Sequence, residues 1–115
     1  MEQLNRIELR GNVGTVRLGS VEDTKVANFT LATSYAYVGR GGEGIIDTMW
    51  HNVVAWEGRS IPDVSCITKG APLYVCGRLR ERKFIGSDGQ ERIALEVLAS
   101  KVVPVDDPEG LSIHM

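Results

Sequence analysis

Apolar and polar residues alternate through most of this chain, and a period of two is typical of strands with one buried face. The alternation predicts five strands, and Gly11 interrupts the first of them, as at a bulge or a bend in a barrel wall. The predicted strands span residues 7–13, 25–33, 47–56, 73–84 and 91–103. Residues expected to face the core are Ile7, Leu9 and Val13, then Ala27, Phe29 and Leu31, then Met49, Val53 and Ala55, then Ile93, Leu95, Val97 and Ala99.

The segments between the strands carry helix, loop and turn signals. Ile61, Val64 and Ile67 recur every three residues, and Gly70 stands where a helix would stop, so residues 59–69 predict one short helix. Four glycines within residues 39–44 indicate a mobile loop before the third strand. Ser-Asp-Gly-Gln at residues 87–90 predicts a hairpin turn, because Asp-Gly readily supplies positive φ.

This order of elements predicts an all-β fold. Five strands with one short helix between the third and the fourth match the OB-fold, a small Greek-key barrel. A parallel α/β sheet is not expected, because no helix follows each strand. The 115 residues are enough for one core, so we assign residues 1–105 to one OB-fold domain and residues 106–115 to a short, disordered C-terminal extension.

The composition is that of a globular protein of the cytoplasm. Hydrophobic residues make up 43% and charged residues 24% of the chain, so disorder is not the expected state of the whole. No apolar run approaches the roughly 18 residues that span a bilayer, and the first residues lack the apolar core of a signal peptide. Cys66 and Cys76 fit neither a metal-ligand spacing nor a disulfide framework, and we interpret both as small buried hydrophobes.

Charge is distributed unevenly along the chain. A formal net charge of −2 argues against a nucleic-acid binder, since such domains are usually basic. However, residues 78–83 contain four basic residues and one acid, whereas acids collect at residues 22–23 and 106–109. A local basic stripe therefore persists despite the negative sum.

Few residues of this chain are suited to catalysis. It has two histidines, no carboxylate pair at a helix or strand spacing, and no glycine-rich phosphate loop with its lysine and helix. His51, flanked by two large residues within a strand, is interpreted as a packed or interface histidine. We therefore expect a protein that is not an enzyme, with no cofactor and no metal site.

Aromatic rings and cations are expected to share strand faces. Trp50 and Trp56 lie six residues apart in one strand, an even offset that projects both from the same face. Phe84 likewise shares a face of its strand with Arg78, Arg80 and Arg82. Cations pair with phosphates, and exposed rings stack on bases at about 1 to 3 kcal/mol per base. The alternatives are tryptophans buried in the core and a solvated, edge-protecting arginine run, but the combination favours a surface for unpaired nucleic acid.

Five short segments carry a family resemblance. Residues 5–14, 26–33, 50–56, 69–70 and 77–84 read NRIELRGNVG, VANFTLAT, WHNVVAW, KG and GRLRERKF. In this order and spacing they resemble the bacterial single-stranded DNA-binding protein family, over about Leu4 to Pro104. The resemblance implies a homotetramer of OB-folds that binds single-stranded DNA without strong sequence preference and protects it during replication, recombination and repair. It also implies a place in the cytoplasm, with the nucleoid.

The resemblance also assigns roles to residues. It implies that bases stack on Trp50, Trp56, Phe84 and Tyr37. It implies that phosphates are bound by Lys69, Arg80, Arg82, Lys83 and Arg6. It places Tyr74 and His51 at or near subunit contacts.

Two departures from the family pattern and two alternatives remain. Asn52 stands where the family often has a cation, which predicts a weaker DNA contact there. Family members commonly continue to an acidic, hydrophobic tip that recruits replication and repair proteins, and no such tail is evident here, so these partners are left open.

The chain could instead be an interaction module, such as a primosomal replication protein, that mainly binds a protein. It could also be an OB-fold that binds RNA or an oligosaccharide.

Overall fold

A computed structural model describes residues 1–61 and 63–105, so the predicted extension over residues 106–115 lies outside the described residues. The elements in chain order are β1 (Ile7–Val21), β2 (Thr24–Val38), β3 (Gly44–Trp56), the 3₁₀ turn η1 (Val64–Cys66), β4 (Pro72–Ile85) and β5 (Glu91–Pro104). Within these described ranges, no helix has the length and apolar character needed to cross a membrane.

The five strands close into a barrel in the order β1-β2-β3-β5-β4. β1 pairs antiparallel with β4 through residues 7–12 and with β2 through residues 12–21. It changes partner near Gly11, where a Cβ would collide with the backbone carbonyl of Ala32, and a register shift follows between Val13 and Val16. A short parallel pairing of β3 with β5 closes the barrel. This topology confirms the predicted OB-fold.

The barrel interior is filled by inward-facing residues of every strand. Burying one such aliphatic or aromatic side chain contributes about 1.5 to 3 kcal/mol. The buried cluster comprises Val13, Ala27, Phe29, Leu31, Val53, Ala55, Leu73, Val75, Val97 and Val102, together with Ile61, Val64 and Ile67 from the segment between β3 and β4. The predicted Ile7, Leu9 and Ala99 are partly buried against this cluster.

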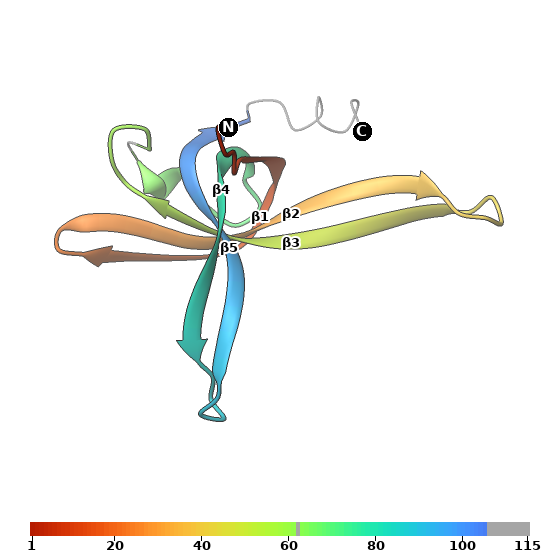
Figure 1. Ribbon diagram of the computed structural model, residues 1–115. Coiled ribbons are helices and arrows are strands. Elements are labelled where there is room, and N and C mark those ends of the chain that lie inside the picture. Colours follow the sequence, from red (N-terminus) through yellow and green to blue (C-terminus); the bar gives the residue numbers. More distant parts are fainter. Residues whose placement is uncertain (62, 106–115) are drawn as a thin grey trace.

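Three hairpins project from the barrel (Figure 1). They are the β1–β2 arm with its turn at Glu22–Asp23, the β2–β3 arm with its turn over residues 39–43, and the β4–β5 arm with its turn over residues 86–90. A two-stranded arm has no core on either face. The prediction that Ile93, Leu95 and Met49 face the core is therefore wrong, since these residues are 58%, 58% and 62% exposed in the arms.

One prediction about the connections needs correction. The expected helix over residues 59–69 is only the single turn η1, where the Asp63 carboxylate accepts the Ser65 N–H, although Ile61, Val64 and Ile67 are buried as the spacing indicated. A loop is found between β2 and β3 over residues 39–43, as predicted, and in it the Gly39 N–H donates to the Glu43 carbonyl at 2.8 Å.

The two cysteines also differ from their interpretation as buried hydrophobes. Cys66 is exposed in η1, and Cys76 is half-buried on β4. By contrast, the turn at residues 87–90 is confirmed, with φ of +80° at Gly89.

Candidate nucleic-acid interface

One outward-facing row crosses all five strands of the barrel. The ladders place Arg17, Asn28, Val54, Leu98 and Arg78 side by side on β1, β2, β3, β5 and β4. Side chains two positions away in each strand project from the same side. We call this side of the sheet the outer face.

Both tryptophans lie on the outer face, as their even offset predicted. Trp50 is 58% exposed and Trp56 is 39% exposed. The Trp50 ring lies close over Gly14 of β1, where an added Cβ would be 2.9 Å from the ring atom Cη2 and 2.7 Å from the Thr30 hydroxyl. Glycine therefore lets the ring rest against the sheet, which leaves more than half of the side chain open to a stacking partner.

Lys69 is brought to the same end of the barrel by backbone hydrogen bonds. Gly70, which follows Lys69, has φ of +86° and donates its N–H to the Val13 carbonyl at 2.8 Å. Val13 directly precedes Gly14, the residue under the Trp50 ring. The backbone that carries Lys69 is therefore held beside the part of β1 that lies under the Trp50 ring.

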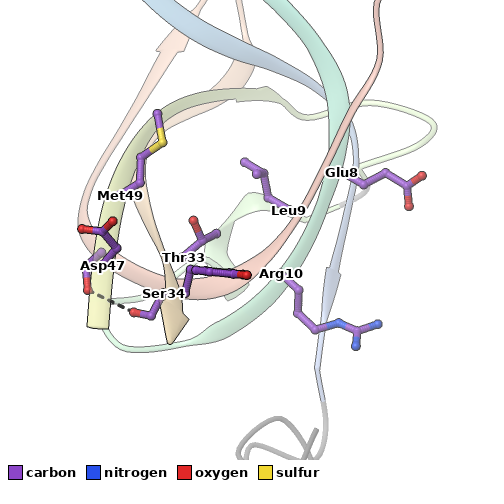
Figure 2. Close-up of a pocket in the computed structure, with 9 residues that line it drawn as sticks. Glu8, Leu9, Arg10, Thr33, Ser34, Asp47 and Met49 are labelled. Carbon is purple, nitrogen blue, oxygen red and sulfur yellow. Dashed lines mark hydrogen bonds between the residues drawn. The ribbon is translucent and has the colours of Figure 1, made fainter. Parts of the chain in front are cut away.

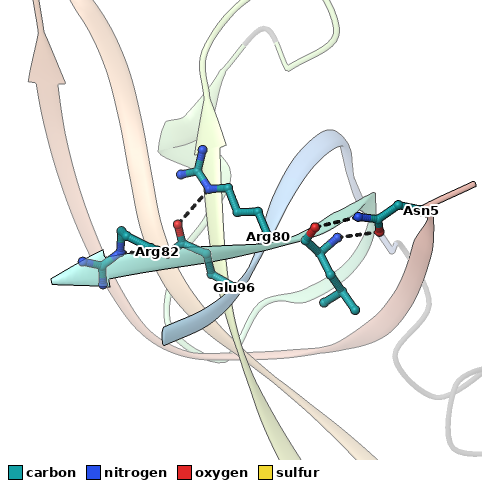
Figure 3. A network of polar contacts seen from close by, with 5 residues as sticks. Asn5, Arg80, Arg82 and Glu96 are labelled. Atoms are coloured by element: carbon teal, nitrogen blue, oxygen red, sulfur yellow. Dashed lines mark hydrogen bonds and ion pairs between the residues drawn. The ribbon is translucent and has the colours of Figure 1, made fainter. Parts of the chain in front are cut away.

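The arginines of β4 surround an acidic residue on the outer face. Glu96 of β5 lies directly opposite Arg80 in the β4–β5 ladder and is only 5% exposed. Its carboxylate accepts the Arg80 Nε–H at 2.9 Å on one oxygen and the Arg82 Nε–H at 3.3 Å on the other (Figure 3). A buried carboxylate needs such partners, because an unpaired charge away from water is strongly unfavourable.

Phe84 continues this group toward the tip of the β4–β5 arm. The Arg82 guanidinium carbon lies 5.2 Å from the centroid of the Phe84 ring, within the range of a cation–π contact. Arg82 therefore links Glu96 to an exposed ring. The even-numbered face of β4 presents three arginines and this ring in the predicted order.

The base of the β4–β5 arm is fixed by the segment that precedes β1. The Asn5 side-chain amide donates to the Leu79 carbonyl at 2.7 Å, and its oxygen accepts the Leu79 N–H at 3.0 Å (Figure 3). A side chain thus takes the place of a strand partner next to Arg80. Arg6, the next residue, forms an exposed ion pair with Glu8 at 3.2 Å.

Two predicted contact residues lie on other faces of the arms. Lys83 alternates with Arg82 and Phe84, so it projects from the opposite side of β4. Tyr37 shares the face of Leu31 rather than that of Trp50, and its ring centroid is 6.0 Å from that of Tyr35. The barrel register therefore does not join these two side chains to the outer face.

The two residues expected at subunit contacts, Tyr74 and His51, each contact a residue that lines an open hollow of about 650 Å³ (Figure 2). The Tyr74 hydroxyl donates to the Glu8 carboxylate at 2.9 Å, and His51 Nε2 lies 2.9 Å from the Thr33 hydroxyl. Both partners, Glu8 and Thr33, line the hollow. The hydrogen bond to Glu8 is the main cause that raises the pKa of Tyr74, and burial lowers the pKa of His51.

Glu96 and Gly14 were missed by the sequence analysis. A signal for Glu96 was present: the turn at residues 87–90 fixes the hairpin register, and counting back from it sets Glu96 opposite Arg80. Gly14 carries no comparable signal, because its neighbour Trp50 belongs to a different strand and reaches across β2. Over the residues that the structure describes, no group of three or more His, Cys, Asp or Glu side chains could hold a metal ion.

The family model and the individual relatives that match this chain indicate the same protein family. The single-strand binding protein family matches residues 4–105. A "Single-stranded DNA-binding protein" of Neisseria meningitidis serogroup A is 33% identical over 104 residues, which cover 86% of this chain and 58% of that protein. A protein of the same name from Rickettsia felis is 36% identical over 100 residues, covering 83% of this chain and 65% of that protein.

A solved structure agrees with these sequence matches. A structure titled "Plasmodium falciparum SSB complex with ssDNA" superposes with a TM-score of 0.74 at 30% identity, covering 92% of this chain and 98% of that chain. The chain thus spans less than two thirds of the two bacterial relatives and nearly all of the solved chain.

Proposed function

Since the chain belongs to the single-strand binding protein family, we propose that it binds single-stranded DNA on its outer face. Bases stack on the rings of Trp50, Trp56 and Phe84, while the phosphates pair with the arginines of β4. The observation that carries this proposal is the shared outer face, on which the ladders align the tryptophans of β3 with the arginines of β4. Every base has a flat face, so this binding has little sequence preference.

This function is binding without chemistry. The protein covers unpaired DNA and so protects it during replication, recombination and repair, in the cytoplasm and with the nucleoid. Lys69 extends the path near Trp50. Tyr37, Lys83 and Arg6 contact DNA only where the strand bends around an arm or past the start of β1.

Fluorescence titration with oligo-dT at several salt concentrations tests both halves of the proposal. Binding should quench the tryptophan emission, and affinity should fall with salt, because phosphate contacts release counterions. Trp56→Ala should weaken binding by about 1 to 3 kcal/mol with little change in the salt slope. Trp56→Phe is the matched control, since it keeps an aromatic face. Equal affinity of all three proteins would contradict stacking on this residue.

Arg82→Ala tests the charge contribution separately. Arg80 still pairs with Glu96 in this variant, so the barrel should remain folded. Losing one phosphate contact should reduce the salt slope by about 0.7. A binder of neutral oligosaccharide would show no such slope, and an interaction module would not bind oligo-dT with comparable strength.

We further propose that the hollow beside β1 is a contact between subunits of a homotetramer. Tyr35, 71% exposed, and Met49 line it together with charged Glu8, Arg10 and Asp47, a mixture suited to a second protein surface. Sedimentation velocity at micromolar concentration should show a tetramer, and Met49→Arg should yield smaller species. Ile46→Arg is the control, because Ile46 is at least as exposed as Met49 and lies on the opposite face of the same arm. A parent protein that sediments as a monomer would refute this proposal and leave the DNA-binding proposal intact.

A further inference from the structure

Glu96 is an acidic residue in the middle of a surface that we expect to bind a polyanion. Its carboxylate is almost fully buried between two arginines of the neighbouring strand. A negative charge at this place repels phosphates, and burying the carboxylate away from water is unfavourable for folding. We therefore expect a favourable effect of Glu96 on DNA binding that offsets both.

The contacts of the two arginines indicate what that effect is. Each guanidinium has five N–H donors, and Glu96 engages only the Nε–H of Arg80 and of Arg82. Over the described residues, neither side chain makes another hydrogen bond or ion pair. The Nη groups, the part of the fork that binds a phosphate in two places, therefore stay available.

We propose that Glu96 is a positioning residue that holds Arg80 and Arg82 by Nε and presents their Nη groups to two phosphates of the bound strand. This inference rests on the proposed function. A free arginine loses side-chain freedom when it binds a phosphate, whereas these two are ordered beforehand, so less entropy is lost on binding. Arg82 also lies against Phe84, so the same carboxylate helps to set the ring on which a base stacks.

The first test compares two substitutions that change the net charge equally. Glu96→Gln removes the buried carboxylate, and Glu81→Gln removes an exposed carboxylate on the opposite face of β4 that forms no ion pair within the described ranges. If charge alone mattered, both variants would bind oligo-dT more tightly than the parent. We expect Glu96→Gln to bind roughly three- to tenfold more weakly than Glu81→Gln, at low and at high salt, because two arginines must then be ordered on binding.

The second test exchanges the arginines for lysines in the same protein. A lysine has a single ammonium nitrogen, so the atom that donates to Glu96 would also have to contact the phosphate, and it has no separate Nη pair to present. In the Arg80→Lys/Arg82→Lys background, Glu96→Gln should therefore bind oligo-dT severalfold more tightly than Glu81→Gln, the reverse of their order in the parent background. A purely structural role for Glu96 would give the same order in both backgrounds. This comparison also needs no variant that leaves a buried carboxylate without a partner.

The outcomes separate the two proposals. If the parent protein does not bind oligo-dT, the proposed function fails. If the parent binds but Glu96→Gln and Glu81→Gln have equal affinity, or if the order of these two variants does not reverse in the lysine background, the positioning role is overturned and the DNA-binding function stands.

Discussion

Removing both arginines beside Glu96 should destabilise the fold itself, before any effect on DNA. In Arg80→Ala/Arg82→Ala, a carboxylate that is 5% exposed would lose both of its ion-pair partners, at 2.9 and 3.3 Å. Removing the partner of a buried charge typically costs about 3 to 5 kcal/mol. Here the truncated side chains are themselves partly exposed and would admit water, so we expect the lower end, about 3 kcal/mol.

Thermal unfolding followed by circular dichroism would measure this loss. A domain of this size shifts its Tm by about 4 °C per kcal/mol, so the double variant should unfold about 10 °C below the parent. Arg82→Ala alone should shift Tm much less, because the shorter Arg80–Glu96 pair remains. All proteins must be compared at one protomer concentration, because assembly changes the apparent stability.

Adding Glu96→Gln to the double variant provides the decisive control. A neutral amide without a partner is far less unfavourable than a buried charge, so the third substitution should restore at least about 1 kcal/mol. The reasoning would be refuted if the double variant unfolded with the parent, or if the third substitution lowered stability further. If the double variant unfolded with the parent, a loss of DNA affinity in that variant could be attributed to lost phosphate contacts and not to a destabilised fold.

Three further predictions concern other parts of the chain. Gly14→Ala should displace the Trp50 ring, because the new Cβ would collide with it. The tryptophan fluorescence should shift and the affinity for oligo-dT should fall while the barrel stays folded. An unchanged fluorescence spectrum would contradict the close packing of the ring on Gly14. Burial lowers the pKa of His51, so the unfolded state binds the proton more readily and the free energy of unfolding should decrease as pH falls below about 6.5; His51→Gln should remove this component from a pH series of urea titrations. Glu22 and Asp23 form a two-residue turn with φ of +50° and +69°, a backbone conformation in which glycine is favoured. Asp23→Gly should therefore stabilise the fold by about 1 kcal/mol and raise the Tm by a few degrees, and an unchanged Tm would show that this turn is not strained.

Local features of the sequence determined the strands, the β4–β5 turn and the pairing of the rings. Period-two alternation reports which residues share a side of one strand, and Asp88-Gly89 reports a backbone that few other residues adopt. By the same rule, the even offset of Trp50 and Trp56 places both side chains on one face of β3, so their common face could be predicted from the sequence. The match of these segments to one family also depends on sequence order alone.

Only the tertiary structure decided what covers each face. Val97 and Leu95 project from the same side of β5, yet Val97 is buried in the barrel and Leu95 is exposed in the arm, because β3 pairs with β5 at Val97 and Leu98 and not at Leu95. The pairing of Glu96 with Arg80 and the seating of Trp50 over Gly14 likewise join different strands. Alternation fixes the side on which a residue projects, but burial and ion pairing depend on which distant strand packs there, and that is set by the closure of the barrel.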